Sequence, residues 1–209
     1  MTDPYIRKGI RILREEGIQS FTDKSTYFAK RKVRNGILQF QKRVFDVSNI
    51  PIENVNTQNR RDIDYRIAFL NEIDDDTDYS ETLYYHFISD PKRWANEPAE
   101  ERCETFVDLV ESIRRNGIQT PITVGRYESA TLQAKVEFDG EKEWYEIDNN
   151  TGYQLIDGAH RVAAATYLGW DTIPAHIIYP HSFEIPEYTE YIRTREPQYK
   201  ELVAEETDS

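Results

Sequence analysis

The residue types best suited to chemistry stand together in the short stretch Asp157-Gly-Ala-His-Arg161. An apolar stretch precedes it, and an alanine-rich stretch that ends at Gly169 follows it. This pattern predicts a buried strand, a sharp turn and a helix. The first turn of a helix offers N–H groups without intrahelical partners and a partial positive charge. We therefore expect the junction to bind an anion such as a phosphate group.

Each residue of this stretch has a predicted role toward a phosphate-bearing ligand. Gly158 lets the backbone come close to the ligand, and Gly158 and Ala159 would supply backbone N–H groups. Arg161 can clamp a phosphate with two parallel hydrogen bonds. His160 can donate to a phosphate oxygen or accept a proton. Asp157 is the candidate metal ligand for Mg²⁺ or the candidate catalytic base.

A second phosphate contact is predicted at Arg114, near the end of the preceding helical segment. A purely structural alternative stays open for the whole stretch. In that alternative Asp157 caps the helix and Arg161 pairs with it four residues on, without any ligand. No acidic residue earlier in the chain can be assigned as the general base.

Composition predicts a soluble protein in the cytoplasm. The 209 residues are 38% apolar, and the mean hydropathy is -0.75. No run approaches the ~20 apolar residues that span a bilayer, and the charged N-terminus does not resemble a secretory signal. The single cysteine, Cys103, excludes an internal disulfide and a cysteine metal cluster.

The net charge of -12 is unevenly distributed. Residues 1–43 hold 11 Lys and Arg against 4 Asp and Glu, whereas the remainder holds 15 against 34. Two helices are expected in this basic arm, at Pro4–Glu16 and Thr22–Asn35, each followed by a glycine. The arm could pack on the body or on a protein partner, lie on an anionic membrane face, or grip nucleic-acid phosphates. The strongly acidic body argues against the last of these.

Beyond the arm, the pattern predicts a mixed α/β domain at 44–185 and a C-terminal helix with an acidic tail at 186–209. The segment 53–90 is weakly patterned: Ile63, Ile67 and Leu70 suggest a short helix, and 83–88 is apolar enough to be buried with His86 inside it. The clearer expectations are a strand at 43–50, a helix from 97 to 116, a strand at 118–124, a hairpin with strands at 129–138 and 142–147, and strands at 153–156 and 170–179.

Three segments together resemble the ParB/sulfiredoxin superfamily. Ser112-Ile-Arg-Arg-Asn-Gly-Ile-Gln-Thr-Pro-Ile-Thr-Val124 is similar to that family's helix-to-strand passage, and Asp157–Arg161 is similar to its nucleotide-contacting box. Leu168-Gly-Trp-Asp-Thr-Ile-Pro174 is similar to its closing segment. The resemblance covers about residues 105–179. It implies a ParB/sulfiredoxin-like α/β fold and contacts between the box and nucleotide phosphates.

The family's members include CTP-binding ParB proteins, ATP-using sulfiredoxins and kinases of free serine, and this chain departs from the first two. A sulfiredoxin-like enzyme would need a cysteine where Ala159 stands. A ParB-like partition protein would need a helix-turn-helix domain, whereas about 30 residues follow Tyr179. The resemblance therefore implies a small-molecule kinase that uses ATP, ADP or CTP with Mg²⁺ on a hydroxyl-bearing metabolite. The alternatives are a non-catalytic nucleotide-dependent regulator or adaptor and a ParB-like DNA-binding protein or nuclease, and a homodimer stays open.

Overall fold

The structure is a computed structural model in which residues 47–209 form one compact unit, separate from residues 1–46. It describes residues 47–57, 60–74, 77–90, 98–127, 131–138, 141–148, 152–179, 183–184 and six residues between 197 and 204. The two helices expected in the basic arm lie outside the described residues. The partner of that arm therefore stays a prediction from the sequence.

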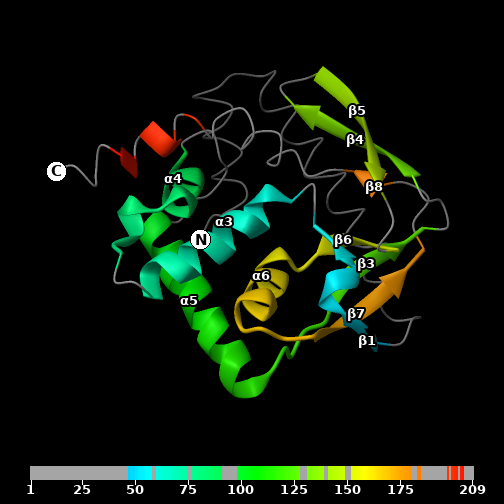
Figure 1. The fold of residues 1–209 in the computed structure, drawn as a ribbon, viewed down its shortest axis with the longest axis horizontal. Coiled ribbons are helices and arrows are strands. Elements are labelled where there is room, and N and C mark those ends of the chain that lie inside the picture. The colour runs from blue at the N-terminus through cyan, green and yellow to red at the C-terminus, as the bar shows by residue number, and fades with distance from the viewer. Residues whose placement is uncertain are drawn as a thin grey trace, which may run out of the picture. The chain divides into compact units, whose positions relative to one another are not determined.

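A five-stranded mixed sheet forms the centre of the unit, in the order β1-β7-β3-β6-β2. Strand β7 pairs antiparallel with β1 and parallel with β3, and β6 pairs antiparallel with β3 and parallel with β2. Figure 1 shows α6 packed beside β6 and β3. The bounds of these strands are Val47–Pro51 for β1, Val55–Asn56 for β2, Ile122–Arg126 for β3, Tyr153–Asp157 for β6 and Thr172–Ile178 for β7.

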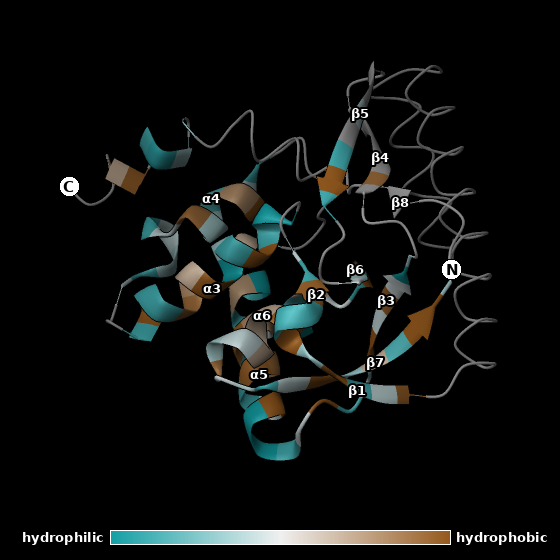
Figure 2. Cartoon of the chain, turned by 45° about the vertical axis from the view of Figure 1, so that its right-hand side comes forward, coloured by the Kyte–Doolittle hydropathy of each residue, from teal (hydrophilic) through white to brown (hydrophobic). Residues whose placement is uncertain are grey.

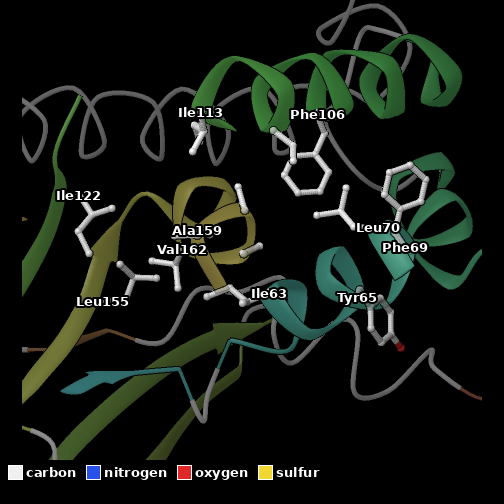
Figure 3. Close-up of a cluster of buried hydrophobic side chains, with 14 of the residues drawn as sticks. Ile63, Tyr65, Phe69, Leu70, Phe106, Ile113, Ile122, Leu155, Ala159 and Val162 are labelled. Carbon is white, nitrogen blue, oxygen red and sulfur yellow. The ribbon is translucent and has the colours of Figure 1, made fainter. Parts of the chain in front are cut away.

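The helices enclose the main hydrophobic core against this sheet. Their bounds are Arg61–Asp74 for α3, Leu83–Ser89 for α4, Ala99–Asn116 for α5 and Ala159–Tyr167 for α6, and short 3-10 turns lie at Ile52–Asn54 and Tyr79–Glu81. Figure 3 shows Phe69 from α3, Phe106 from α5 and Val162 from α6 converging in one cluster. Hydrophobic and hydrophilic residues alternate around α3, α4 and α5 (Figure 2), as expected of helices with one buried face.

A second, three-stranded sheet has the order β5-β4-β8, with bounds Thr131–Phe138 for β4, Glu141–Asp148 for β5 and Phe183–Glu184 for β8. Strands β4 and β5 form the predicted hairpin, and Leu132 and Ile147 are buried. Trp144 faces the other way and is 65% exposed. This alternation along β5 is typical of a sheet with one covered face.

The predicted mixed α/β fold class is confirmed, while the weakly patterned segment holds more helix than expected. Residues 61–74 form a full 14-residue helix, and the buried run at 83–88 lies in the second helix, α4, with His86 in the core. Helix α5 ends at Asn116 as predicted, and Gly117 follows it with a positive φ of 73°. In the C-terminal segment, residues 199–201 are helical and the Tyr199 side chain is buried against Phe87 of α4.

In the part of the chain that the structure describes, no helix is long and apolar enough to cross a membrane.

Candidate functional site

Gly158 makes the turn between β6 and α6, and only glycine fits there. Its backbone is left-handed, with φ of 108° and ψ of 26°, a region that is unfavourable for residues with a side chain. A Cβ atom at this position would lie 2.7 Å from Cγ2 of Ile122 and 3.2 Å from Nη2 of Arg161. The glycine therefore allows both the turn and the close packing of the box on β3.

The side chain of Arg161 donates hydrogen bonds to the loop that leads into β3. Its Nη1 donates to the carbonyl oxygens of Thr120 at 2.7 Å and Pro121 at 2.6 Å. Its Nη2 donates to Oδ2 of Asp157 at 3.3 Å, and the two side chains are 17% and 53% exposed. The predicted Asp157–Arg161 pair is therefore present, and the guanidinium is already engaged before any ligand binds. Asp157 keeps more than half of its side chain open to solvent.

His160 lies on a different side of α6 from Arg161. Its ring meets the ring of Phe106 on α5 edge to face, with centroids 5.4 Å apart. The residue is exposed, and the described part of the chain gives its ring no hydrogen bond. Consecutive residues of an α-helix are turned by about 100°, so the two side chains of the box reach separate surroundings.

A buried charge cluster lies at the start of α3, on the His160 side of the box. We call Arg60, Asp62 and Arg66 the α3 charge cluster. Asp62 is 1% exposed and accepts from Nε of Arg60 at 3.1 Å and from Nη1 of Arg66 at 2.7 Å. Arg60 and Arg66 are each 4% exposed. The guanidinium of Arg66 also lies 5.3 Å from the ring centre of Tyr84, a favourable cation–π geometry.

The cluster carries one carboxylate and two guanidinium groups, and this shapes the protonation of its neighbours. Burial raises the pKa of Asp62, but Arg60 and Arg66 outweigh it and hold the pKa below its usual value. Burial, and then the charge of Arg66, lowers the pKa of His160 to about 3, although the residue as a whole is exposed. In the free protein His160 is therefore a neutral imidazole, which is a poor proton acceptor.

This cluster was not predicted from the sequence. Asp62 and Arg66 stand four residues apart, which is the spacing of a helical ion pair, so a pairing signal was present. Such pairs usually lie on the solvated face of a helix. The burial of this one depends on the packing of α3 against α6 and α4, which the spacing does not reveal.

Arg114, the second predicted phosphate contact, lies away from the box. Its Nη1 pairs with Oε1 of Glu111. The hydroxyl of Tyr167 donates to Oδ2 of Asp74, which raises the pKa of Tyr167, and the charge of Arg114 partly offsets that rise. Tyr167 is the last residue of α6, whereas the box lies at the first turn. A nine-residue helix is about 13 Å long, so the structure does not bring Arg114 to the other candidate residues.

Asp157 would be a lone protein ligand for a metal ion. Within the described ranges no three His, Cys, Asp or Glu side chains lie close enough together to hold one. A Mg²⁺ ion commonly takes one or two carboxylates and completes its shell with phosphate oxygens and water, so this residue fits a nucleotide-bound ion. Cys103 is fully buried on α5, and burial raises the pKa of its thiol to about 12. It is therefore not an activated nucleophile.

Comparison with known proteins finds similarity over part of this chain. Residues 91–183 match the ParB N-terminal domain. A sulfiredoxin from Arabidopsis thaliana is 18% identical over 71% of this chain and 94% of its own, with a TM-score of 0.31. The C-terminally truncated chromosome-partitioning protein ParB from Caulobacter crescentus, complexed with CTP-gamma-S, is 18% identical over 72% of this chain and 53% of its own, with a TM-score of 0.32. No curated protein sequence matches the chain.

The match of residues 91–183 to the ParB N-terminal domain agrees with the resemblance to the ParB/sulfiredoxin superfamily seen in the sequence. The family match begins at residue 91 and includes α5, the box and β7. Helices α3 and α4 and the α3 charge cluster lie ahead of the matched residues.

Proposed function

We propose that this chain binds a nucleotide at the first turn of α6, with ATP, ADP and CTP as the candidates. The observation that carries the proposal is the geometry of the box: a tight glycine turn at the first turn of α6, next to an exposed histidine whose ring has no hydrogen bond in the described part of the chain. Helix N-termini of this kind favour phosphate groups. The similarity of residues 91–183 to the ParB N-terminal domain, a domain that the resemblance associates with nucleotide binding, supports the same ligand class.

In this proposal the phosphates meet the N–H groups of Ala159 and His160, and His160 donates to a phosphate oxygen in its neutral form. Arg161 already donates hydrogen bonds to the loop before β3 and to Asp157, so only the Nε and one Nη2 N–H group are left for a phosphate. We expect it to act mainly by holding the turn, with Asp157 beside it. A bound Mg²⁺ would neutralise phosphate charge, with Asp157 as its protein ligand.

The finer proposal is phosphoryl transfer to a small hydroxyl-bearing metabolite. The acceptor oxygen would bond to the terminal phosphorus while the bond from that phosphorus to its bridging oxygen breaks. The acceptor proton needs a base, and His160 is a poor one because its pKa lies at about 3. Asp157, exposed at the carboxyl end of β6, is therefore the proposed base if it does not hold the metal.

A non-catalytic nucleotide-dependent regulator or adaptor is the second candidate. The observation that favours it is the scarcity of catalytic groups in the described part of the box: one exposed carboxylate, a neutral histidine and an engaged arginine. Such a site can bind a phosphate and couple its binding to the conformation of the loop that Arg161 holds.

A thermal-shift screen of the full chain with ATP, ADP and CTP, each with and without Mg²⁺, tests the proposed binding. A ligand at about 100 times its Kd adds about 2.7 kcal/mol of stability, which is a shift of about 5–10 °C for a chain of this size. The matched variants are His160→Ala in the box and Arg115→Ala at the exposed end of α5. Phosphorus NMR with a pool of hydroxyl metabolites then separates a kinase from a regulator, because only a kinase forms a new phosphate ester.

A further inference from the structure

The imidazole of His160 contacts one aromatic ring in the described part of the chain. That ring belongs to Phe106 on α5, with centroids 5.4 Å apart and 66° between the two planes. Among the described residues, the imidazole has no hydrogen bond and no second ring contact. An exposed side chain without directional contacts exchanges among staggered rotamers. Phe106 is therefore the contact that can hold this imidazole in one orientation.

Phe106 is itself fixed by the hydrophobic core. It is 2% exposed, and its ring stacks on that of Phe69 of α3 with centroids 6.2 Å apart. A second ring, that of Tyr84 on α4, lies tilted against it at 5.8 Å. Figure 3 shows Phe106 and Phe69 in the same buried cluster. Close-packed interiors keep side chains in single rotamers, so three helices give the exposed histidine a rigid surface to lie against.

The place of His160 in α6 gives this contact a consequence for binding. His160 is the second residue of the helix, in the first turn, where N–H groups have no intrahelical partners. In the proposed function a phosphate meets these N–H groups and the imidazole together. Ordering a mobile side chain during association lowers affinity. A ring that is already held in place avoids that loss.

We propose that Phe106 is a positioning residue for nucleotide binding: its ring holds the imidazole of His160 at the first turn of α6 before the ligand arrives. This inference rests on the proposed binding of a nucleotide at the box. Phe106 is buried and acts through His160, without touching the ligand itself. The contribution of an aromatic pair corresponds to a factor of about 2 to 10 in affinity.

Variants of the full chain separate the contact with His160 from the packing of the core. Phe106→Leu removes the ring and keeps an apolar side chain, and Phe106→Met is a second replacement of the same kind. Phe87→Leu is the matched control on α4. Phe87 is also fully buried in the aromatic cluster, but its ring meets those of Tyr65, Tyr84 and Tyr199 and does not meet His160.

NMR coupling constants of His160 in the free protein give the first readout, because they report the populations of its χ1 rotamers. The wild type and Phe87→Leu should show one rotamer, and Phe106→Leu should show an average over several. Averaged couplings in the wild type, or one unchanged rotamer in Phe106→Leu, would overturn the proposal. Phe106→Met takes the place of Phe106→Leu if the latter does not fold. The wild-type couplings need no variant and decide by themselves whether the ring is held.

Calorimetric titration with ATP and CTP in the presence of Mg²⁺ gives the second readout. Phe106→Leu should bind about 2- to 10-fold more weakly than the wild type, and Phe87→Leu should bind as the wild type does. In the His160→Ala background, Phe106→Leu should weaken binding no further, because the two residues act as one unit. Equal losses in both backgrounds would show a general effect on the core and overturn the positioning role.

The two readouts keep this inference apart from the proposed function. A wild type that binds neither nucleotide counts against the proposed function, while the couplings of His160 still decide whether Phe106 holds its ring. Equal affinities of the wild type and Phe106→Leu overturn the role of Phe106 and leave nucleotide binding at the box intact.

Discussion

Replacing Gly158 by alanine measures the cost of the turn that presents the box. The left-handed backbone at φ of 108° costs a residue with a Cβ atom about 1–2 kcal/mol. The new Cβ would also lie 2.7 Å from Cγ2 and 3.0 Å from Cβ of Ile122, inside a core where both atoms are buried. Overpacking of this kind adds about 1–3 kcal/mol. We therefore expect a loss of about 2–5 kcal/mol in the free energy of unfolding.

Gly169, just past the C-terminal end of α6, provides a matched control. It also has a positive φ, of 69°, but a Cβ atom there would meet nothing within 4 Å. Gly169→Ala should therefore cost only the backbone part, about 1–2 kcal/mol.

Urea unfolding of both variants and the wild type gives the comparison, with the m-value checked for constancy. The difference between the two variants, about 1–3 kcal/mol, isolates the close approach of Gly158 to Ile122. Equal losses in Gly158→Ala and Gly169→Ala would refute the argument that the box packs on β3 through this glycine.

Three further outcomes follow from single contacts. Arg161→Met should lower the free energy of unfolding by about 0.5–1.5 kcal/mol without any ligand, because the carbonyl oxygens of Thr120 and Pro121 before β3 lose their donor. Unchanged stability in chemical unfolding would mean that these bonds do not hold the loop. In the folded protein the pKa of His160 is lowered from 6.5 to about 3, so the unfolded state binds more protons between these pH values. The free energy of unfolding should therefore rise with pH across that window. His160→Gln should flatten this rise in Tm against pH, and an equally steep rise would contradict the lowered pKa. Tyr199→Phe removes the 3.0 Å hydrogen bond to buried Asp90 and should cost about 1–2 kcal/mol, and a neutral substitution would show that the C-terminal segment is not held by this bond.

The strand–turn–helix of the box could be predicted from the sequence because each of its signals is local. An apolar run, an Asp-Gly turn, alanines at helical spacing and a closing glycine all lie within 17 residues. The hairpin at β4 and β5 was predictable for the same reason, since Asp139-Gly140 separates two alternating stretches. The Asp157–Arg161 pair followed from their spacing of four residues.

The surroundings of the box could not be predicted in the same way. That His160 and Arg161 face different neighbours follows from helical geometry, but the identity of those neighbours depends on tertiary packing. Helix α4 has seven residues, too few for a period of 3.6 to be told from a buried strand. Arg60 and Arg66 look like ordinary surface arginines in the sequence, and tertiary packing around α3 buries them.

Calorimetric titration of the full chain with ATP and CTP in the presence of Mg²⁺ tests the central claim most directly. The account predicts one nucleotide bound per chain, an affinity at least about tenfold weaker in His160→Ala, or about 1.4 kcal/mol, and no change in Arg115→Ala. No detectable heat with either nucleotide, or equal affinities in His160→Ala and the wild type, would contradict it.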